Sequence, residues 1–291
     1  MFDLYFKHLY PSFPEWQEDP FSPWIFGEGV LLTVLSFFEK DLEDSFSLRD
    51  ILKCEIFMDS GAFSAAAMGF SLDPYEVAEM QALLKADLVV PLDLVITLED
   101  SLDEADQKVA ETIRNTEILL DFLPAGSEII GPLQGLTPEL IERMFTEFLN
   151  LGVKKFALGG VVFQDIKQAL ERIKIARDIT KGYNLHVFGK FLHPKLLKPV
   201  MRLCDSVDGY GYILSSVKGL YIHKREYKAI AGINDDQLAE CSCTACRDHS
   251  LLDFQRADRE AQYLIIKHNI SALIALKEQY AREILKENKE F

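Results

Sequence analysis

Three cysteines and one histidine toward the C-terminal end have the types and spacing of a metal site. Cys241, Cys243 and Cys246 fall within six residues, and His268 lies further along the chain. Thiolate and imidazole are the ligands that zinc prefers, and four protein ligands with no open position describe a structural site. Five cysteines in total is an odd count, which a disulfide framework does not explain. We therefore expect these four side chains to bind a structural Zn2+ ion.

The fourth ligand has a rival in His249, which is close enough in sequence to reach the same ion. His268 is preferred because it lies beyond a predicted helical run, Leu251–Lys267, and would tie two segments together. The other two cysteines, Cys54 and Cys204, are expected to be small buried residues rather than ligands.

A second set of candidates follows short apolar runs in the middle of the chain. These polar groups are Asp59-Ser60-Gly61, Asp93, Gln134-Gly135 and Gly159-Gly160, which follow four of the runs, and Asp208-Gly209, which lies near a further run. Asp and Gly in such places are also common turn and capping residues. Their recurrence at five runs favours a site, because the carboxyl ends of barrel strands converge on one face where active sites are built.

Three carboxylates, Asp59, Asp93 and Asp208, would meet at that face. Burial and mutual repulsion push the pKa values of such groups apart, so that one stays ionised while another holds a proton. The set suits nucleophilic, acid/base and substrate-orienting roles, and it equally suits a divalent cation. A metal-dependent hydrolase is disfavoured because we expect no histidine beside them at a strand end.

Apolar runs that alternate with helical periodicity would position these residues. The predicted strands are Cys54–Met58, Leu88–Leu92, Glu128–Leu133, Lys155–Leu158, Leu185–Phe188 and Ser206–Tyr210. Helices are predicted over Asp103–Leu123 and Thr137–Asn150. Strands that alternate with helices imply a parallel sheet. No glycine-rich phosphate loop follows a strand, which disfavours a doubly wound open sheet.

Six strand-helix units are visible, and the run near Leu31–Phe37 with the final helical stretch can complete eight. We predict a (β/α)8 TIM barrel with a C-terminal zinc-binding subdomain, which suits 291 residues. Residues 1–50, rich in aromatic residues and proline, are expected to form an irregular N-terminal cap. Residues 51–291 would then form the barrel domain, with the zinc-binding subdomain at about 230–270.

The charge balance of 31 basic and 46 acidic residues gives a net charge of −15, which argues against nonspecific coating of nucleic acid. No apolar run reaches the roughly eighteen residues of a membrane span, so we expect a cytoplasmic protein without membrane contact. Basic residues are concentrated in one third of the chain, where they form either phosphate contacts or a solvated mixed surface. They are Lys195, Lys198, Arg202, Lys218, Lys224, Arg225 and Lys228.

From about Asp59 to the C-terminus, the chain resembles the tRNA-guanine transglycosylases, including the archaeosine-type enzymes of archaea. The motifs that carry the resemblance, in the family's order, are Asp59-Ser60-Gly61-Ala62-Phe63-Ser64, Asp87 through Asp93, Gln134-Gly135, Leu158-Gly159-Gly160, Cys204-Asp205-Ser206-Val207-Asp208, and the three cysteines followed by His268-Asn269. The resemblance implies a zinc-containing (β/α)8 barrel that exchanges guanine in a nucleic acid for a 7-deazaguanine base.

The resemblance also implies roles for individual residues. Asp208 takes the position of the nucleophile that forms a covalent glycosyl-enzyme, and Asp59 that of the general acid/base. The residues implied to bind the base are Ser60, Phe63, Asp93, Gln134, Gly159 and Gly160. Phe63 would stack on the base, and Asp93 with Gln134 would read its polar edge. The expected partners are tRNA, a guanine or 7-deazaguanine base, and a second chain in a homodimer or heterodimer.

Departures from the family pattern keep alternatives open. Ala62 and Ser64 replace a glycine and a glutamine, and the loop after Gly160 reads Val-Val-Phe-Gln-Asp. Shortened relatives that modify DNA share the Asp-Ser-Gly-Ala-Phe-Ser type of motif, so DNA is the alternative polymer. The altered loops and the acidity of the chain also suit a catalytically silent subunit that binds nucleic acid or a partner protein.

Overall fold

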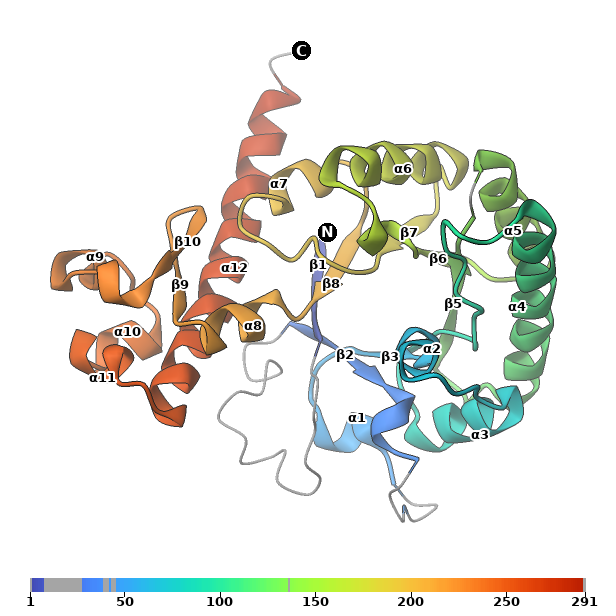
Figure 1. The fold of residues 1–291 in the computed structure, drawn as a ribbon, viewed down its shortest axis with the longest axis horizontal. Helices are drawn as coiled ribbons and strands as arrows, with labels where there is room; N and C mark the ends of the chain where they lie inside the picture. The colour runs from blue at the N-terminus through green and yellow to red at the C-terminus, as the bar shows by residue number, and fades with distance from the viewer. Residues whose placement is uncertain (1, 8–27, 39–41, 43–45, 136, 290–291) are drawn as a thin grey trace.

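The computed structural model describes residues 2–7, 28–38, 42, 46–135 and 137–289, and its centre is a closed barrel of eight parallel strands in chain order (Figure 1). The strands are β1 (Asp3–Lys7), β2 (Gly29–Thr33), β3 (Ile56–Asp59), β4 (Leu88–Val89), β5 (Glu128–Leu133), β6 (Lys155–Leu158), β7 (Asn184–Val187) and β8 (Ser206–Gly209). β8 pairs with β1 and closes the barrel. The predicted TIM barrel is therefore confirmed.

The six predicted strands are all present, with differences at their ends. β5 and β6 have the predicted bounds, whereas β4 keeps only two of the five residues predicted for it. The backbone amide of Val90 still donates to Met58 at 3.0 Å, after which the chain leaves the ladder and carries Asp93 toward the barrel mouth.

The N-terminal segment corrects one prediction. β1 and β2 belong to the barrel, so residues 3–7 and 29–33 are not an irregular cap, and the barrel begins well before residue 51. The predicted run Leu31–Phe37 ends as a 3-10 turn, Val34–Ser36. The Pro- and Trp-rich stretch that suggested a cap falls within 8–27, outside the described residues.

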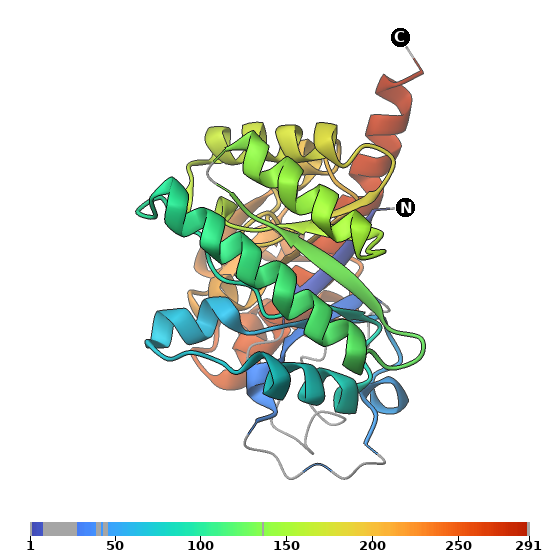
Figure 2. The same cartoon turned by 90° about the vertical axis from the view of Figure 1, so that its right-hand side faces the viewer.

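Helices cover the outside of the barrel. They are α1 (Leu48–Ile51), α2 (Ala62–Met68), α3 (Pro74–Leu84), α4 (Leu102–Phe122), α5 (Pro138–Asn150), α6 (Ile166–Ile179), α7 (Leu197–Val200) and α8 (Gly211–Val217). Figure 2 shows the run from α3 to α6 as neighbouring helices across one side. α4 begins with a capping box in which Ser101 and Glu104 satisfy each other's backbone amides.

Side chains that point inward fill the barrel, so it is a packed core rather than a channel. The buried members of this inner cluster are Tyr5, Leu31, Phe57, Leu88, Val90, Ile130 and Ala157. A site can therefore form only at an end of the barrel, where the strand ends and loops leave room for a ligand.

A smaller subdomain follows α8. It comprises an antiparallel hairpin, β9 (Leu220–His223) and β10 (Glu226–Ala229), and the short helices α9 (Asp235–Ala239), α10 (Thr244–Asp248) and α11 (Leu251–Gln255). It begins earlier than the predicted residue 230, because Tyr221 belongs to its buried cluster. The helix predicted over Leu251–Lys267 is interrupted after Gln255, where Asp258 starts a new helix by accepting from the Ala261 amide at 2.9 Å.

That new helix, α12 (Arg259–Glu287), runs between the subdomain and the barrel in Figure 1. Leu264 and Ile265 pack in the subdomain cluster, whereas Ile270 and Leu273 pack in the main core. α12 therefore provides the final helical cover that the sequence predicts. Within the described ranges, no helix combines the length and apolar character needed to cross a membrane.

Candidate active site and metal cluster

A cavity of about 260 Å³ lies at the carboxyl ends of the barrel strands. Seven of the eight residues predicted to act on or bind a substrate line it: Asp59, Phe63, Asp93, Gln134, Gly159, Gly160 and Asp208. The eighth, Ser60, is fully buried beneath them. The structure thus brings together residues that are up to about half the chain apart in sequence.

Asp208 is the most enclosed of the three carboxylates, with 3% of its surface exposed. The backbone amide of Gly189 donates to its Oδ1 at 2.9 Å. His186 Nε2 lies 3.4 Å from the same oxygen. The expectation that no histidine accompanies the carboxylates is therefore wrong, because His186 in β7 contacts Asp208 in β8.

Asp59 ends β3 and faces Lys7, a lysine outside the set of predicted site residues. Lys7 Nζ lies 3.7 Å from Asp59 Oδ2. Burial raises the pKa of Asp59, Lys7 opposes this shift and Asp208 adds to it, and the pKa lies above its usual value. Burial lowers the pKa of Lys7, but Asp59 and Asp208 outweigh it. Lys7 escaped prediction because β1 lies in the segment that the composition suggested was a cap.

Asp93 is held by two neighbouring side chains. Ser60 donates to its Oδ1 at 3.0 Å, and Gln134 Nε2 donates to its Oδ2. The Ile96 amide donates to Gln134 Oε1 at 3.0 Å, which turns the amide group of Gln134 toward Asp93. Burial raises the pKa of Asp93 to about 7, and Asp59 adds to the shift. This carboxyl can therefore change its protonation state near neutral pH.

The glycine pair after β6 leaves room for these groups. A Cβ on Gly159 would lie 3.3 Å from Gln134 Cγ, and Gly160 has a φ of +75°, which L side chains rarely adopt. The Gly159 amide donates to Leu133 O at 2.9 Å within the barrel. This amide is therefore already engaged, although the family resemblance assigns the Gly159-Gly160 backbone to the base.

Two phenylalanines stand at the edge of the cavity. Phe63 and Phe163 are 49% and 48% exposed, and their ring centroids lie 5.7 Å apart at an interplanar angle of 41°. Large exposed aromatic rings beside a cavity are suited to stacking on a planar ligand. Phe163 lies in the loop that departs from the family pattern, and this departure is the only sequence signal that could have identified it.

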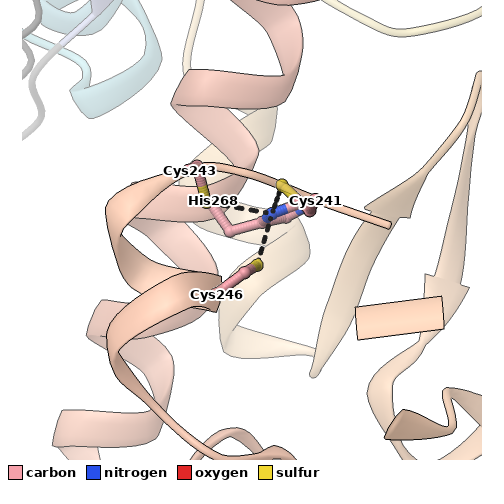
Figure 3. Close-up of side chains that lie close together, drawn as sticks. All are labelled: Cys241, Cys243, Cys246 and His268. Carbon is pink, nitrogen blue, oxygen red and sulfur yellow. Dashed lines mark hydrogen bonds between the residues drawn. The ribbon is translucent and has the colours of Figure 1, made fainter. Parts of the chain in front are cut away.

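The predicted metal ligands also converge. Ligand atoms of Cys241, Cys243, Cys246 and His268 all lie within 4.8 Å of one another, and no other such group of His, Cys, Asp or Glu occurs in the part of the chain described. The three Sγ atoms lie 3.5, 3.6 and 3.2 Å from His268 Nδ1, in the same order (Figure 3). Soft thiolates with one imidazole suit a metal ion of the zinc type.

Contacts around His268 present its Nδ1 to the sulfur atoms. His268 Nε2 donates to Ile222 O at 2.8 Å, and the ring stacks on Tyr221 with centroids 3.6 Å apart. A histidine ligand commonly donates its second ring nitrogen in this way. The adjacent Asn269 accepts from the Ile222 amide at 2.9 Å, which ties α12 to β9. His249 lies outside the group, with its Nδ1 3.1 Å from Ala245 O.

Comparison with known families decides the relationship of this chain. The model of the family described as Queuine tRNA-ribosyltransferase matches residues 40–290. This match covers the barrel from before β3 to the end of α12, together with the Cys3His cluster. The chain belongs to the queuine tRNA-ribosyltransferase family.

Curated relatives of this family member are archaeal proteins named tRNA-guanine(15) transglycosylase. The protein of Sulfolobus acidocaldarius is 28% identical over 269 residues, which are 87% of this chain and 52% of that protein. The protein of Archaeoglobus fulgidus is 24% identical over 249 residues, covering 81% of this chain and 50% of that protein. The chain spans about half the length of the curated relatives it matches.

In this member of the queuine tRNA-ribosyltransferase family, much of the predicted basic cluster lines one groove of about 620 Å³ beside β9 and β10. Most of its cations have carboxylate partners: Lys195 pairs with Glu226 at 3.1 Å, and Lys198 pairs with Glu283 at 2.6 Å. Arg225 pairs with Glu283 as well. The groove is thus a mixed surface, and phosphate contacts there stay a prediction.

Proposed function

We propose that this chain is a guanine transglycosylase that exchanges guanine in tRNA for a free 7-deazaguanine base. The observation that carries the proposal is the convergence of Asp59, Asp93 and Asp208 on one cavity with the exposed ring of Phe63 at its edge. Family membership and the names of the curated relatives support guanine and tRNA as substrates. A tRNA substrate also agrees with the expected cytoplasmic location.

Base exchange would proceed by double displacement. An Asp208 carboxylate oxygen attacks the anomeric carbon of the ribose, the carbon–nitrogen bond to guanine breaks, and the sugar is held as an ester. The incoming base attacks the same carbon through its ring nitrogen and releases the carboxylate. Two inversions give overall retention of configuration, and no oxidant or metal ion is needed to balance either step.

Asp59 would move the proton. A protonated Asp59 gives its proton to the departing guanine, and the resulting carboxylate takes one from the incoming base. The raised pKa of Asp59 supports the first step, and Lys7 at 3.7 Å would stabilise the carboxylate formed by it. One proton leaves with guanine and one returns with the new base, so the enzyme ends each cycle unchanged.

The base would be held by groups on opposite sides of the cavity. Asp93 and Gln134 present acceptor and donor atoms to the polar edge of a purine, and Phe63 stacks on its face after the nucleotide is turned out of its stack. Because Gly159 uses its amide within the barrel, Gly160 is the member of the pair left to meet the base carbonyl.

Incorporation of labelled guanine tests the proposal. The protein is incubated with labelled guanine and either tRNA or duplex DNA, and label in the recovered polymer is counted. Asp208→Asn should reduce incorporation by at least about 1,000-fold, since the amide is a very poor nucleophile. Asp121→Asn, an exposed change on α4, is the matched control and should retain activity.

Each outcome of this experiment has a definite reading. Label in DNA alone would replace tRNA with the alternative polymer. No label in either polymer would favour the silent subunit that binds nucleic acid or a partner. Full incorporation by Asp208→Asn would refute the assignment of the nucleophile.

We also propose that the Cys3His cluster binds a structural Zn2+ ion. Bond lengths near 2.3 and 2.0 Å at a tetrahedral angle give a sulfur–nitrogen separation of about 3.5 Å. The observed separations of 3.2 to 3.6 Å are close to this value. The ion would join α10, α12 and the loop that carries Cys241, and it would supply no group to the chemistry at Asp208. The predicted dimer around this region stays part of the proposal.

A further inference from the structure

A buried histidine lies directly against the candidate nucleophile. His186 is 1% exposed, and it is paired in register with Ser206 of the neighbouring strand. Asp208 follows Ser206 by two residues, so both side chains point to the same side of β8, toward the barrel interior. The three side chains form one contiguous polar group, and they come from two adjacent strands.

The atoms next to the two ring nitrogens favour a proton on Nε2 of the imidazole. His186 Nδ1 lies 2.9 Å from Ser206 Oγ, and Nε2 lies 3.4 Å from Asp208 Oδ1. A carboxylate can only accept, so attraction at Nε2 requires a proton on that nitrogen. The Ser206 hydroxyl then donates to the free lone pair of Nδ1. This chain of donors runs from Ser206 through His186 to Asp208.

Three aromatic rings fix the imidazole in place. Tyr5, Phe57 and Phe188 each meet it edge to face, with ring centroids 5.6, 4.8 and 4.9 Å away. The Tyr5 hydroxyl is engaged with Glu55, so it does not compete for the imidazole. Since the ring has no room to swing out, its donor stays directed at Asp208.

The contacts to Asp208 also distinguish its two oxygens. Both the Gly189 amide and His186 approach Oδ1. Anchoring one oxygen fixes the plane of the carboxylate and leaves Oδ2 to face the sugar. We propose that His186, set in its Nε2–H tautomer by Ser206, is a positioning residue that orients Asp208 so that Oδ2 attacks. This inference rests on the proposed base exchange and adds a residue to it.

Kinetics of three variants test the role. His186→Leu removes the donor, and formation of the covalent glycosyl-enzyme should slow about 30- to 100-fold, because small misplacements of a reacting group cost rates of this size. His186→Gln keeps an amide donor of similar reach and should recover to within about 5-fold of wild type. Ser206→Ala should cause an intermediate loss of about 3- to 10-fold.

Binding separates positioning from general damage to the pocket. The Kd for guanine should change less than about 3-fold in His186→Leu, because Asp93 and Gln134 hold the base and His186 does not line the cavity. Equal losses in His186→Leu and His186→Gln, or a large loss of guanine affinity in His186→Leu, would mean a purely structural role and overturn the inference.

A spectroscopic readout keeps the inference testable if the protein exchanges no base. Nitrogen-15 NMR of labelled histidine, assigned through the signal lost in His186→Gln, should show the Nε2–H tautomer for His186, with a shift on Asp208→Asn. The Nδ1–H tautomer overturns the inference in either case. An active wild type with unaffected His186→Leu refutes the inference alone, whereas an inactive wild type with the Nε2–H tautomer refutes the proposed function alone.

Discussion

The barrel mouth and the Cys3His cluster are both groups of converging polar side chains, but they are assembled in different ways. Three of the four residues of the Cys3His cluster come from six consecutive residues, and helix α12 provides His268. Groups at the mouth come one by one from the ends of separate strands and depend on barrel closure. A compact motif can thus be read from spacing, whereas a site at strand ends needs the topology.

The two regions also differ in what they leave unsatisfied. In the metal cluster, every ligand atom faces the others and His268 uses its second nitrogen within the fold. At the mouth, Asp59 and Asp93 have raised pKa values and Phe63 is half exposed. The Cys3His cluster, whose polar atoms face one another, is suited to stabilising the fold. The barrel mouth, with its raised carboxyl pKa values and an exposed ring, is suited to binding and proton transfer.

The largest expected effect is the loss of stability in the C-terminal subdomain when the proposed metal ion is removed. Cys246→Ser, or a strong chelator, should lower the opening free energy of residues 220–270 by more than about 5 kcal/mol, since structural zinc contributes directly to folding. Hydrogen exchange followed by mass spectrometry measures this loss. Guanine affinity should change less than about 3-fold, and Cys54→Ser is the matched control. Equal loss of guanine binding would show that the two regions are not separable.

The second effect is the pH dependence of folding stability that Asp93 causes at the barrel mouth. Asp93 binds its proton more tightly when folded, with a pKa of about 7, than in the unfolded chain, where it is 3.8. Its contribution to stability is therefore complete below about pH 4 and is lost as the pH rises through about 7. Asp93→Asn lacks this dependence, so its stability relative to wild type should improve by roughly 2–4 kcal/mol between pH 4 and pH 8.

Urea unfolding of both proteins at several pH values measures that change, and Asp121→Asn controls for the loss of one carboxylate. If the difference in stability between Asp93→Asn and wild type stays constant with pH, the raised pKa of Asp93 is contradicted. Asp93 would then titrate like a carboxyl on the protein surface. A constant loss of stability in Asp93→Asn that is added to the pH-dependent change is compatible with the raised pKa. It is expected because asparagine has one side-chain oxygen, whereas the two oxygens of Asp93 accept from Ser60 and Gln134.

The smallest expected effect compares the two rings at the edge of the cavity. Phe63→Ala should weaken guanine binding by about 1–3 kcal/mol, the usual contribution of an aromatic ring stacked on a base. Phe163→Ala should weaken guanine binding less. The family motif assigns the stacking role to Phe63, and Phe163 is placed beside the cavity by its contact with the Phe63 ring. Calorimetry with guanine measures both, with Phe70→Ala, an exposed ring outside the cavity, as control. A larger loss for Phe163 would reverse the assignment.

The sequence predicts the structure best where local pattern and tertiary contacts agree. The predicted bounds of β5, β6 and α4 agree with the structure within one residue, because short apolar runs and the acidic first turn of α4 act locally. The four residues predicted as metal ligands lie together, and three of them are already within six residues in sequence. The three aspartates Asp59, Asp93 and Asp208 could be predicted to lie near one another because each is at or next to an apolar run, although their shared cavity depends on the closed barrel.

The residues that escaped prediction depend on contacts between distant segments. β1 is a five-residue strand whose pairing with β8 and β2 is invisible in its own sequence, so Lys7 was not recognised as part of the site. His186 lies within an apolar run and reads as a core histidine until the register of β7 and β8 places it opposite Ser206. No local periodicity carries that information.

The way α12 joins both cores has a consequence for the modularity of this protein. Strand β8 is followed by α8, the hairpin and three short helices before the chain returns in α12 to cover the barrel. The subdomain is therefore an insertion within the last strand-helix unit. Truncating the chain after α8 would remove α12 from the barrel as well as the subdomain. His268 and Ile270, which packs on the barrel, are only two residues apart in α12. Recombination with another barrel would therefore have to transfer the Cys3His cluster and α12 together.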